Sequence, residues 1–530
     1  MNLWLSLNKA ITLWPDKDAI VDGEKRFTYR QFGERVASLC ERMKEFGLQR
    51  GSTVAISCPN KSEYMEIYYA CAASGVVLVP LNYRLASEEI VDIIADSDAE
   101  LIFFHTDFWK QALEILPECR EMRRVVWIGE RHPSVLTNVE AEQINYEDLM
   151  KEPGTFAGLP HMSADDLAHL YYTSGTTGRP KGVMLSHGNV MVNALASVAE
   201  LEFSAKDTWL HAAPLFHLAD AWSTFALTWV GGKHVFLPHF KSNEVLELIE
   251  KEQVTATVLV PTMLNAMLND AQLGAFNYGS MRLIITGGSP IAPETVRRVM
   301  KSFGCEYVQL YGMTETSPFL TISRPKAEHL HLPEDKQVEI RARTGRPYMG
   351  AEVLVVRADG TPVNNDNREV GEIIARGPTI TRGYWKQPEA TAQAIKDSWI
   401  HTGDLAVVDE HGYINIVDRK KDMIITGGEN VFSTEVEYAM YEHPGVAECA
   451  VFGIPDERWG ESVHAVVVRR KGHEELGEDE LINFVKERLA KYKAPRSVEF
   501  LVELPKTGSG KIYKKELREK FWTGRVKQVN

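Results

Sequence analysis

The sequence predicts an α/β protein with largely parallel sheets, followed by a small β-rich subdomain and a further α+β unit. Helix and strand signals alternate up to about residue 345, which is typical of strands joined by helices. Beyond that point short strands separated by turn signals predominate, and mixed signals return from about residue 422. The chain has 530 residues, which is too long for one compact core, so at least two domains are expected.

The first region carries clear boundaries for its helices and strands. Thr28 and Gln31 have the spacing of a helix capping box, and apolar residues follow at helical intervals as far as Gly47. Pro293 is placed to begin a helix that Gly304 ends. Buried strands are expected at residues 54–57, 76–79, 253–261 and 281–286.

The remainder of the chain is predicted to contain shorter strands and fewer helices. Strands are expected at residues 351–357, 371–376, 404–408 and 413–417, with turns at residues 358–360 and 409–412. In the last region residues 446–453 and 463–469 are strand-like. Leu481, Val485 and Leu489 share one face of a predicted helix.

Composition narrows the class of protein. The chain is 44% hydrophobic and 25% charged, which is ordinary for a soluble globular protein, and its net charge of -14 argues against a nucleic-acid partner. It contains no run of 18 apolar residues and no secretion signal, so no transmembrane segment is expected. The six cysteines lack CxxC or zinc-site spacing, and we expect them to be reduced and mostly buried in a cytoplasmic protein.

The strongest motif is the run YYTSGTTGRPKGVMLSH at residues 171–187. Its hydroxyl residues can offer hydrogen bonds to an anion, Gly175 and Gly178 let the backbone approach closely, and Lys181 adds positive charge. Pro180 occupies the position where a Walker A loop needs its second glycine, so this is a different phosphate-binding pattern. A flexible surface loop would not explain the Pro-Lys-Gly and the apolar run behind it.

Four further motifs suit a nucleotide but are weaker alone. Residues 311–316 offer an aromatic face for a purine, and Glu315 there can hold Mg²⁺. Residues 402–404 place a carboxylate after a tight turn, where it can accept hydrogen bonds from ribose hydroxyls. Residues 418–422 and 505–511 are basic or mixed-charge segments. Taken singly, these segments also fit an ordinary turn, a solvated charge run and a mobile loop.

In order and spacing, the five segments resemble the motifs of the adenylate-forming (ANL) superfamily, which includes acyl-CoA synthetases, coumarate-CoA ligases, firefly luciferase and peptide-synthetase adenylation domains. The resemblance covers nearly the whole chain. It implies a large α/β domain with stacked sheets and a small β-barrel-like subdomain at residues 1–418. It also implies a hinge at 419–421 and a small mobile α+β domain at 422–530.

The resemblance further implies an ATP-dependent acyl-CoA synthetase that uses Mg²⁺, a small-molecule carboxylic acid, ATP and CoA. By similarity, Lys511 and Thr314 act at the α-phosphate, and Glu315 with Thr176 holds the metal. The resemblance assigns ATP binding to Thr173, Ser174, Gly175, Thr176, Thr177, Gly178, Lys181, Gly288, Tyr311, Gly312, Asp404 and Arg419. Many relatives are homodimers, although the sequence itself identifies no interface.

Two half-reactions would share one site if the C-terminal domain turned about Lys421. This rotation would withdraw Lys511 and bring Gly427 and Gly428 beside the pantetheine of CoA. A plain β-turn is the other reading of the two glycines.

The acyl pocket is the least defined part of the predicted site. The resemblance places His217 and Gly287 there, although His217 also fits a structural histidine. The aromatic run at residues 219–231 fits either the wall of an acyl tunnel or a core helix. We expect a medium- or long-chain fatty acid as substrate. An aryl, short or branched acid, a carrier protein as acceptor, and a non-catalytic nucleotide-binding protein are the alternatives.

Overall fold

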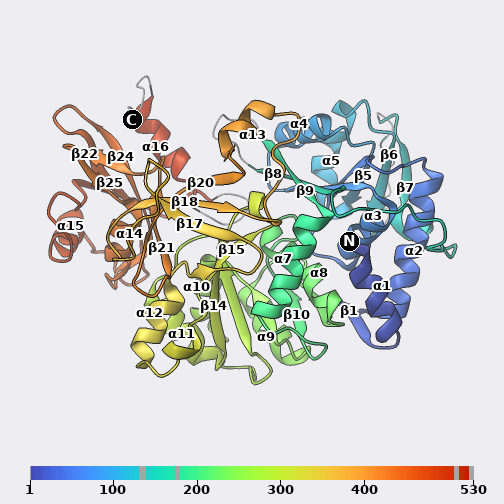
Figure 1. Cartoon of the computed structure of the whole chain (residues 1–530), viewed down its shortest axis with the longest axis horizontal. Helices are drawn as coiled ribbons and strands as arrows, with labels where there is room; N and C mark the ends of the chain where they lie inside the picture. Colours follow the sequence, from blue (N-terminus) through green and yellow to red (C-terminus); the bar gives the residue numbers. More distant parts are fainter. Residues whose placement is uncertain (1, 131–135, 137–138, 174–179, 507–511, 524–530) are drawn as a thin grey trace.

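The computed structural model describes residues 2–130, 136, 139–173, 180–506 and 512–523. Within these residues the chain forms two large sheets, a small antiparallel sheet and a C-terminal sheet that lies to one side of the rest (Figure 1). The predicted fold class, a large α/β domain with a small β subdomain and an α+β C-terminal domain, is confirmed.

The first large sheet has seven strands, and all neighbours are parallel except the β8–β9 hairpin. In sheet order the strands are β7 (Glu142–Asn145), β6 (Arg124–Ile128), β5 (Leu101–His105), β3 (Thr53–Ser57), β4 (Val77–Pro80), β8 (Leu167–Thr173) and β9 (Lys181–Ser186). The outer face packs on α4 (Ser87–Ser97) and α5 (Trp109–Ile115).

The second large sheet has nine strands, with a parallel interior from β14 to β1 and antiparallel edges. In sheet order they are β16 (Arg346–Pro347), β15 (Phe319–Ile322), β14 (Glu306–Gly312), β13 (Leu283–Gly287), β12 (Ala256–Val258), β10 (Thr208–His211), β11 (Lys233–Phe236), β1 (Asp18–Asp22) and β2 (Lys25–Thr28). Its outer helices are α9 (Ser242–Lys251), α10 (Pro261–Leu268), α11 (Pro293–Phe303) and α12 (Glu334–Ala342).

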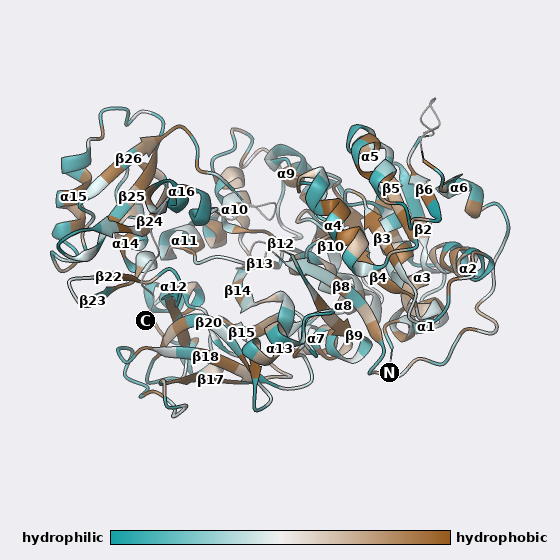
Figure 2. Cartoon of the chain, turned by 90° about the horizontal axis from the view of Figure 1, so that it is seen from above, coloured by the Kyte–Doolittle hydropathy of each residue, from teal (hydrophilic) through white to brown (hydrophobic). Residues whose placement is uncertain are grey.

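A layer of helices fills the space between the two sheets. They are α1 (Trp4–Leu13), α2 (Tyr29–Glu45), α3 (Ser62–Ser74), α7 (His187–Glu200) and α8 (Leu218–Trp229). One buried cluster joins Ile56 of β3, Trp222 of α8 and Ile285 of β13, so both sheets share this core. Apolar residues accordingly colour central strands such as β3 and β5 (Figure 2). Most of the run at residues 219–231 lies in α8, which is a core helix because Trp222 and Phe225 are fully buried.

The predicted β-rich subdomain is a five-stranded antiparallel sheet with its own apolar cluster. Its strands are β17 (Glu352–Val356), β18 (Gly371–Arg376), β19 (Ile395–Lys396), β20 (Trp399–Val408) and β21 (Ile414–Arg419), with α13 (Pro388–Ala394) alongside. The C-terminal unit consists of β22 (Ile424–Thr426), β23 (Glu429–Val431), α14 (Ser433–Tyr441), β24 (Val446–Asp456), β25 (Gly460–Arg469), α15 (Glu478–Lys486), β26 (Ser497–Leu501) and α16 (Lys514–Trp522).

Several local predictions are confirmed. Thr28 and Gln31 form the capping box of α2, and α11 runs from Pro293 to a C-cap at Gly304 with φ +62°. The expected strand at residues 253–261 is shorter, because Pro261 begins α10. All six cysteines are free and five are buried. Among the described residues, no helix is long and apolar enough to span a bilayer.

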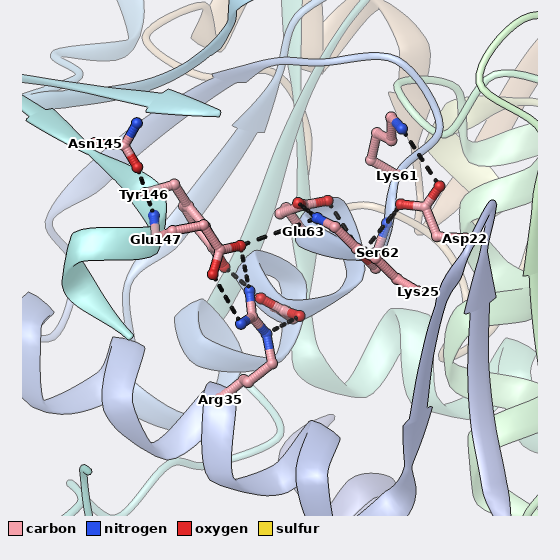
Figure 3. A network of polar contacts seen from close by, with 10 residues as sticks. Asp22, Lys25, Arg35, Lys61, Ser62, Glu63, Asn145, Tyr146 and Glu147 are labelled. Atoms are coloured by element: carbon pink, nitrogen blue, oxygen red, sulfur yellow. Dashed lines mark hydrogen bonds and ion pairs between the residues drawn. The ribbon is translucent and has the colours of Figure 1, made fainter. Parts of the chain in front are cut away.

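A buried network of charges ties the N-terminal elements together (Figure 3). The Arg35 guanidinium of α2 contacts Glu66 of α3 at 2.7 Å and makes a bidentate pair with Glu147 of α6 (Tyr146–Leu149). The Tyr146 hydroxyl also donates to Glu66, at 2.8 Å. Beside this centre lie the pairs Lys25–Glu63 and Lys61–Asp22. The network gives each buried carboxylate a cation or a hydroxyl donor.

Candidate active site

Three residues predicted from three separate motifs meet at the carboxyl end of β14 in the nine-stranded sheet. The Tyr311 hydroxyl, at the end of β14, donates to Asp404 Oδ2 at 2.7 Å. Arg419 lies opposite Asp404 in the β20–β21 pair, and its Nε is 3.2 Å from Oδ1. Burial, followed by the Asp404 carboxylate, raises the pKa of Tyr311, so the phenol remains a donor. The arrangement fixes the Tyr311 ring and holds a carboxylate beside it.

The backbone around Tyr311 leaves no room for side chains at two predicted glycines. A Cβ on Gly312 would lie 1.8 Å from the Pro318 carbonyl oxygen, and one on Gly287 would lie 2.8 Å from that of Leu310. Gly287 ends β13 directly opposite Leu310 of β14, and Gly288 follows with φ +86°. Gly287 and Gly288 therefore lie beside the strand that carries Tyr311.

Glu315 sits in the 3₁₀ turn Thr314–Thr316 that follows β14, with Thr314 half-buried at its start. Its side chain is buried and accepts a hydrogen bond from the Tyr384 hydroxyl at 2.9 Å. Burial raises the pKa of Glu315 against the opposing effects of hydrogen bonds and of Lys181. Carboxylate and hydroxyl oxygens are the donors that Mg²⁺ prefers, so these residues fit a magnesium site.

Both ends of the predicted phosphate loop lie together. Thr173 and Lys181 are opposite each other in the β8–β9 hairpin, and the Lys181 ammonium lies 5.0 Å from the centre of the Tyr384 ring. Ser174, Gly175, Thr176, Thr177 and Gly178, together with Lys511, lie outside the described residues. The predicted roles of these six residues stay predictions.

The acyl segment, residues 211–217 leading to His217, is held by Asn60, which precedes α3, and by Tyr68 within α3. Asn60 donates to the carbonyls of His211 and Ala213 and accepts from the Leu215 amide, all at 2.9–3.0 Å. The Tyr68 hydroxyl contacts Tyr171 Oη at 2.6 Å and donates to the Leu215 carbonyl at 3.0 Å. His217 follows two residues later as the N-cap of α8, and its ring packs on Phe216.

These clamps join the acyl segment to the phosphate loop, because Tyr171 stands two residues before Thr173.

The predicted hinge joins β21 to β22. Asp418 precedes it, and its carboxylate accepts from the Ser433 amide at 2.5 Å, so it caps the first turn of α14. The half-buried Lys514 contacts Ser433 and lies 2.7 Å from Glu437. Burial, opposed by Lys514, raises the pKa of Asp418 to about 6. Burial lowers the pKa of Lys421 within the hinge.

Gly427 and Gly428 occupy the two-residue turn of the β22–β23 hairpin, with φ of +61° and +84°. A Cβ on Gly427 would lie 2.7 Å from the Trp459 ring, whereas one on Gly428 would meet no atom within 4 Å. The two glycines therefore form a tight turn, and their predicted place beside CoA stays a prediction.

Sequence reasoning missed three side chains of this region. Tyr384 stands 69 residues after Glu315, and Tyr68 and Asn60 stand 147 and 155 residues before Leu215. The Gly-Tyr-Trp run at residues 383–385 was the one local signal for Tyr384. Contacts across such separations have no signature in spacing or periodicity.

Comparison with known proteins agrees with this geometry. The model of the family described as "AMP-binding enzyme" matches residues 7–385, and the model described as "AMP-binding enzyme C-terminal domain" matches residues 435–511. Feruloyl-CoA synthase from Amycolatopsis sp is 39% identical over 508 residues, 96% of each chain. Fatty acid–[acyl-carrier-protein] ligase ScoC from Streptomyces coeruleorubidus is 34% identical over 520 residues, 97% of this chain and 96% of that protein.

A solved structure extends the agreement to three dimensions. The o-succinylbenzoate-CoA synthetase of Bacillus subtilis, in complex with ATP and a magnesium ion, superposes with a TM-score of 0.82 and 30% identity. The match covers 98% of this chain and 99% of that one. Since the family match spans most of the chain and Tyr311, Asp404 and Arg419 converge from separate motifs, the chain belongs to the AMP-binding enzyme family of the ANL superfamily and is an AMP-forming acid–CoA ligase.

Proposed function

We propose that this ligase activates an aromatic carboxylic acid, of the aryl or arylacrylic kind, and transfers it to CoA. The observation that carries the proposal is the 39% identity with a feruloyl-CoA synthase over 96% of both chains. The position of α8 supports it, because the run that could have lined a long acyl tunnel is packed into the core between the sheets. A compact acid therefore suits the site better than a long chain.

In the first half-reaction a carboxylate oxygen of the acid attacks the α-phosphorus of ATP. A P–O bond forms, the bond to pyrophosphate breaks, and acyl-AMP results. Lys511 offsets the negative charge that develops between the carboxylate and the α-phosphate, and Thr314 contacts the same phosphate. Mg²⁺, when bound by Glu315 with Thr176, supplies positive charge at the phosphates.

The nucleotide is held by groups from several separate segments of the chain. Tyr311 stacks on adenine, with its ring fixed by the hydrogen bond to Asp404. The Asp404 carboxylate also accepts hydrogen bonds from the ribose hydroxyls, with Arg419 beside it. Gly312 and Gly288 keep the backbone close to the nucleotide. The segment from Thr173 to Lys181 binds the phosphates, and His217 and Gly287 border the acid.

In the second half-reaction residues 422–530 turn about the hinge at 419–421, with Lys421 as the pivot. Lys511 leaves the site, and the turn at Gly427 and Gly428 takes its place beside pantetheine. The CoA sulfur, as thiolate, attacks the acyl carbonyl carbon, the C–S bond forms, and the C–O bond to AMP breaks. Both half-reactions thus take place at a single site on residues 1–418.

A second candidate is a medium- or long-chain fatty acid. The observation in its favour is the 34% identity with a fatty acid–[acyl-carrier-protein] ligase over 97% of this chain. The same relative raises a carrier protein as an alternative acceptor of the acyl group.

The test is CoA-dependent AMP release across matched acids: acetate, dodecanoate, palmitate, benzoate, coumarate and ferulate. Highest kcat/KM for an aromatic acid supports the first proposal, and a peak at one fatty chain length transfers the function to the second. ATP–pyrophosphate exchange measured alongside shows activation on its own. Exchange without CoA-dependent turnover would mean that another thiol, such as that of a carrier protein, accepts the acyl group.

A further inference from the structure

Tyr384 contacts both charged groups proposed to handle the metal and the phosphates. Its hydroxyl donates to Glu315 Oε1 at 2.9 Å, and its ring lies under the Lys181 ammonium at 5.0 Å. Glu315 comes from the turn after β14 of one sheet, and Lys181 comes from β9 of the other. A single side chain from a third segment therefore connects two elements that belong to different sheets.

The backbone holds Tyr384 firmly in this position. The Trp385 amide donates to the Gly182 carbonyl at 2.7 Å, and the Met184 amide donates to the Gly383 carbonyl at 3.0 Å. These bonds attach residues 383–385 to β9 as a short additional bridge, centred on Val183 and Tyr384. Tyr384 therefore moves with the strand that carries Lys181.

The same segment is also attached to Glu315. The Thr381 amide donates to the Glu315 carbonyl at 2.8 Å, while the Thr381 hydroxyl donates to the Met184 carbonyl at 2.6 Å. Segment 381–385 thus fixes the distance between the turn of Glu315 and β9. A hydroxyl bonded to one oxygen of a carboxylate also sets the plane of that carboxylate, and with it the direction of the second oxygen.

We propose that Tyr384 is a positioning residue for Mg²⁺·ATP: its hydroxyl orients Glu315 toward the metal, and its ring orients Lys181 toward the phosphates. The inference rests on the proposed roles of Glu315 and Lys181 and adds the group that sets their mutual geometry. Loss of a hydrogen-bonded partner behind a metal ligand typically weakens metal binding by about 10- to 100-fold. Loss of the ring additionally removes a cation–π contact from the lysine.

Two substitutions separate the two contacts of Tyr384. Tyr384→Phe removes the hydroxyl and keeps the ring, whereas Tyr384→Leu removes both. Tyr348→Phe is the matched control, because the Tyr348 hydroxyl is buried and makes a bond of the same 2.9 Å length, to Ser197. Glu315→Gln serves as the reference for loss of the proposed metal ligand itself.

The experiment is calorimetric titration of the full-length protein with ATP at a series of MgCl₂ concentrations, and with AMP in the absence of metal. Tyr384→Phe should raise the Mg²⁺ concentration needed for half-maximal ATP affinity by about 10- to 100-fold and leave AMP binding as in the wild type. Tyr384→Leu should also weaken ATP binding at saturating Mg²⁺. Tyr348→Phe should match the wild type in every titration.

The outcomes distinguish the positioning role of Tyr384 from the proposed metal site at Glu315. If Glu315→Gln shifts the Mg²⁺ dependence and Tyr384→Phe does not, Tyr384 has no positioning role. If Glu315→Gln itself leaves the dependence unchanged, the proposed metal site at Glu315 is wrong. Equal effects of Tyr384→Phe on AMP and on Mg²⁺·ATP would assign Tyr384 to general packing and overturn the inference.

Discussion

Two regions of this ligase hold buried glutamates whose partners differ. In the N-terminal network Glu66 is in contact with the Arg35 guanidinium at 2.7 Å and with a tyrosine hydroxyl (Figure 3). In the active site Glu315 has a tyrosine hydroxyl at 2.9 Å. Within the part of the chain that the structure describes, no salt bridge within 4.0 Å involves Glu315, and Lys181 and Arg419 act on it only from farther away.

The difference separates a charge network that stabilises the fold from a carboxylate that is proposed to bind a ligand. Removing a carboxylate from water is costly unless a cation compensates it. The Arg35 network supplies its cations from the chain, so its charges are balanced before any ligand arrives. Glu315 is buried without such a pair. In the proposed function, the compensating cation is the Mg²⁺ that binds with the nucleotide. Substitutions in the first region should therefore change stability, and those in the second should change binding or rate.

The largest stability effect is expected for Arg35→Met. The substitution leaves Glu66 buried without its cation, and removal of one partner of a buried pair costs about 3–5 kcal/mol in the free energy of unfolding. Activity per folded molecule should stay near the wild-type value. Urea denaturation and specific activity in the cold measure the two quantities.

The control for Arg35→Met is Arg123→Met. Arg123 is 70% exposed and pairs with Glu100, so its loss should cost about 0–1 kcal/mol. Equal destabilisation by the two variants would contradict the structural role of the Arg35 network.

Lys511→Ala should have the largest effect on the functional side. Loss of a charge that acts only in the transition state typically costs about 100- to 1000-fold in rate. Pyrophosphate exchange should fall by this factor, while thioester formation from supplied acyl-AMP and the urea midpoint stay unchanged. A parallel fall of both half-reactions would refute the assignment of Lys511 to adenylation.

Asp404→Asn should have an intermediate effect that is confined to nucleotide binding. The carboxylate loses its charge-assisted bonds to ribose, which weakens ATP and AMP binding by about 10-fold. Arg419, which is 55% exposed, can be solvated when its partner is neutralised, so unfolding should change little. Calorimetric titration with AMP measures the affinity, and wild-type affinity for AMP would remove Asp404 from the nucleotide site.

The smallest effect is expected in the pH dependence at the hinge. The pKa of Asp418 is raised to about 6 by burial, so the folded state binds this proton more tightly than the unfolded state. Its contribution to the free energy of unfolding therefore falls as pH rises from about 4 to about 6. Two charged groups face the same carboxylate: Lys514 lowers the pKa of Asp418 and Asp422 raises it, and burial outweighs both.

Asp418→Asn removes the titration and keeps an acceptor for Ser433. Its melting temperature relative to the wild type should increase between pH 4 and pH 6 and then level off. Melting curves with a constant difference over this range would show that Asp418 does not titrate there.

The sequence predicted most of the fold because the periodicity of buried strands is local. It also identified Tyr311, Asp404 and Arg419 as candidates, although each motif alone was weak. Their mutual contact could not be derived, because β20 and β21 pair in one sheet while β14 belongs to another, and only the packing of the two sheets brings Tyr311 to Asp404. Tyr384 and Asn60 were missed for the same reason, since their partners are remote in sequence.

The attachment of residues 381–385 to β9 has a consequence for synthesis. Both large sheets have all their strands once β16, ending at Pro347, has left the ribosome, so the two-sheet core can form at that stage. Glu315 then still lacks Tyr384, and Asp404 and Arg419 have not yet been translated. A growing chain can thus form its two-sheet body before the residues proposed to hold ATP are all present.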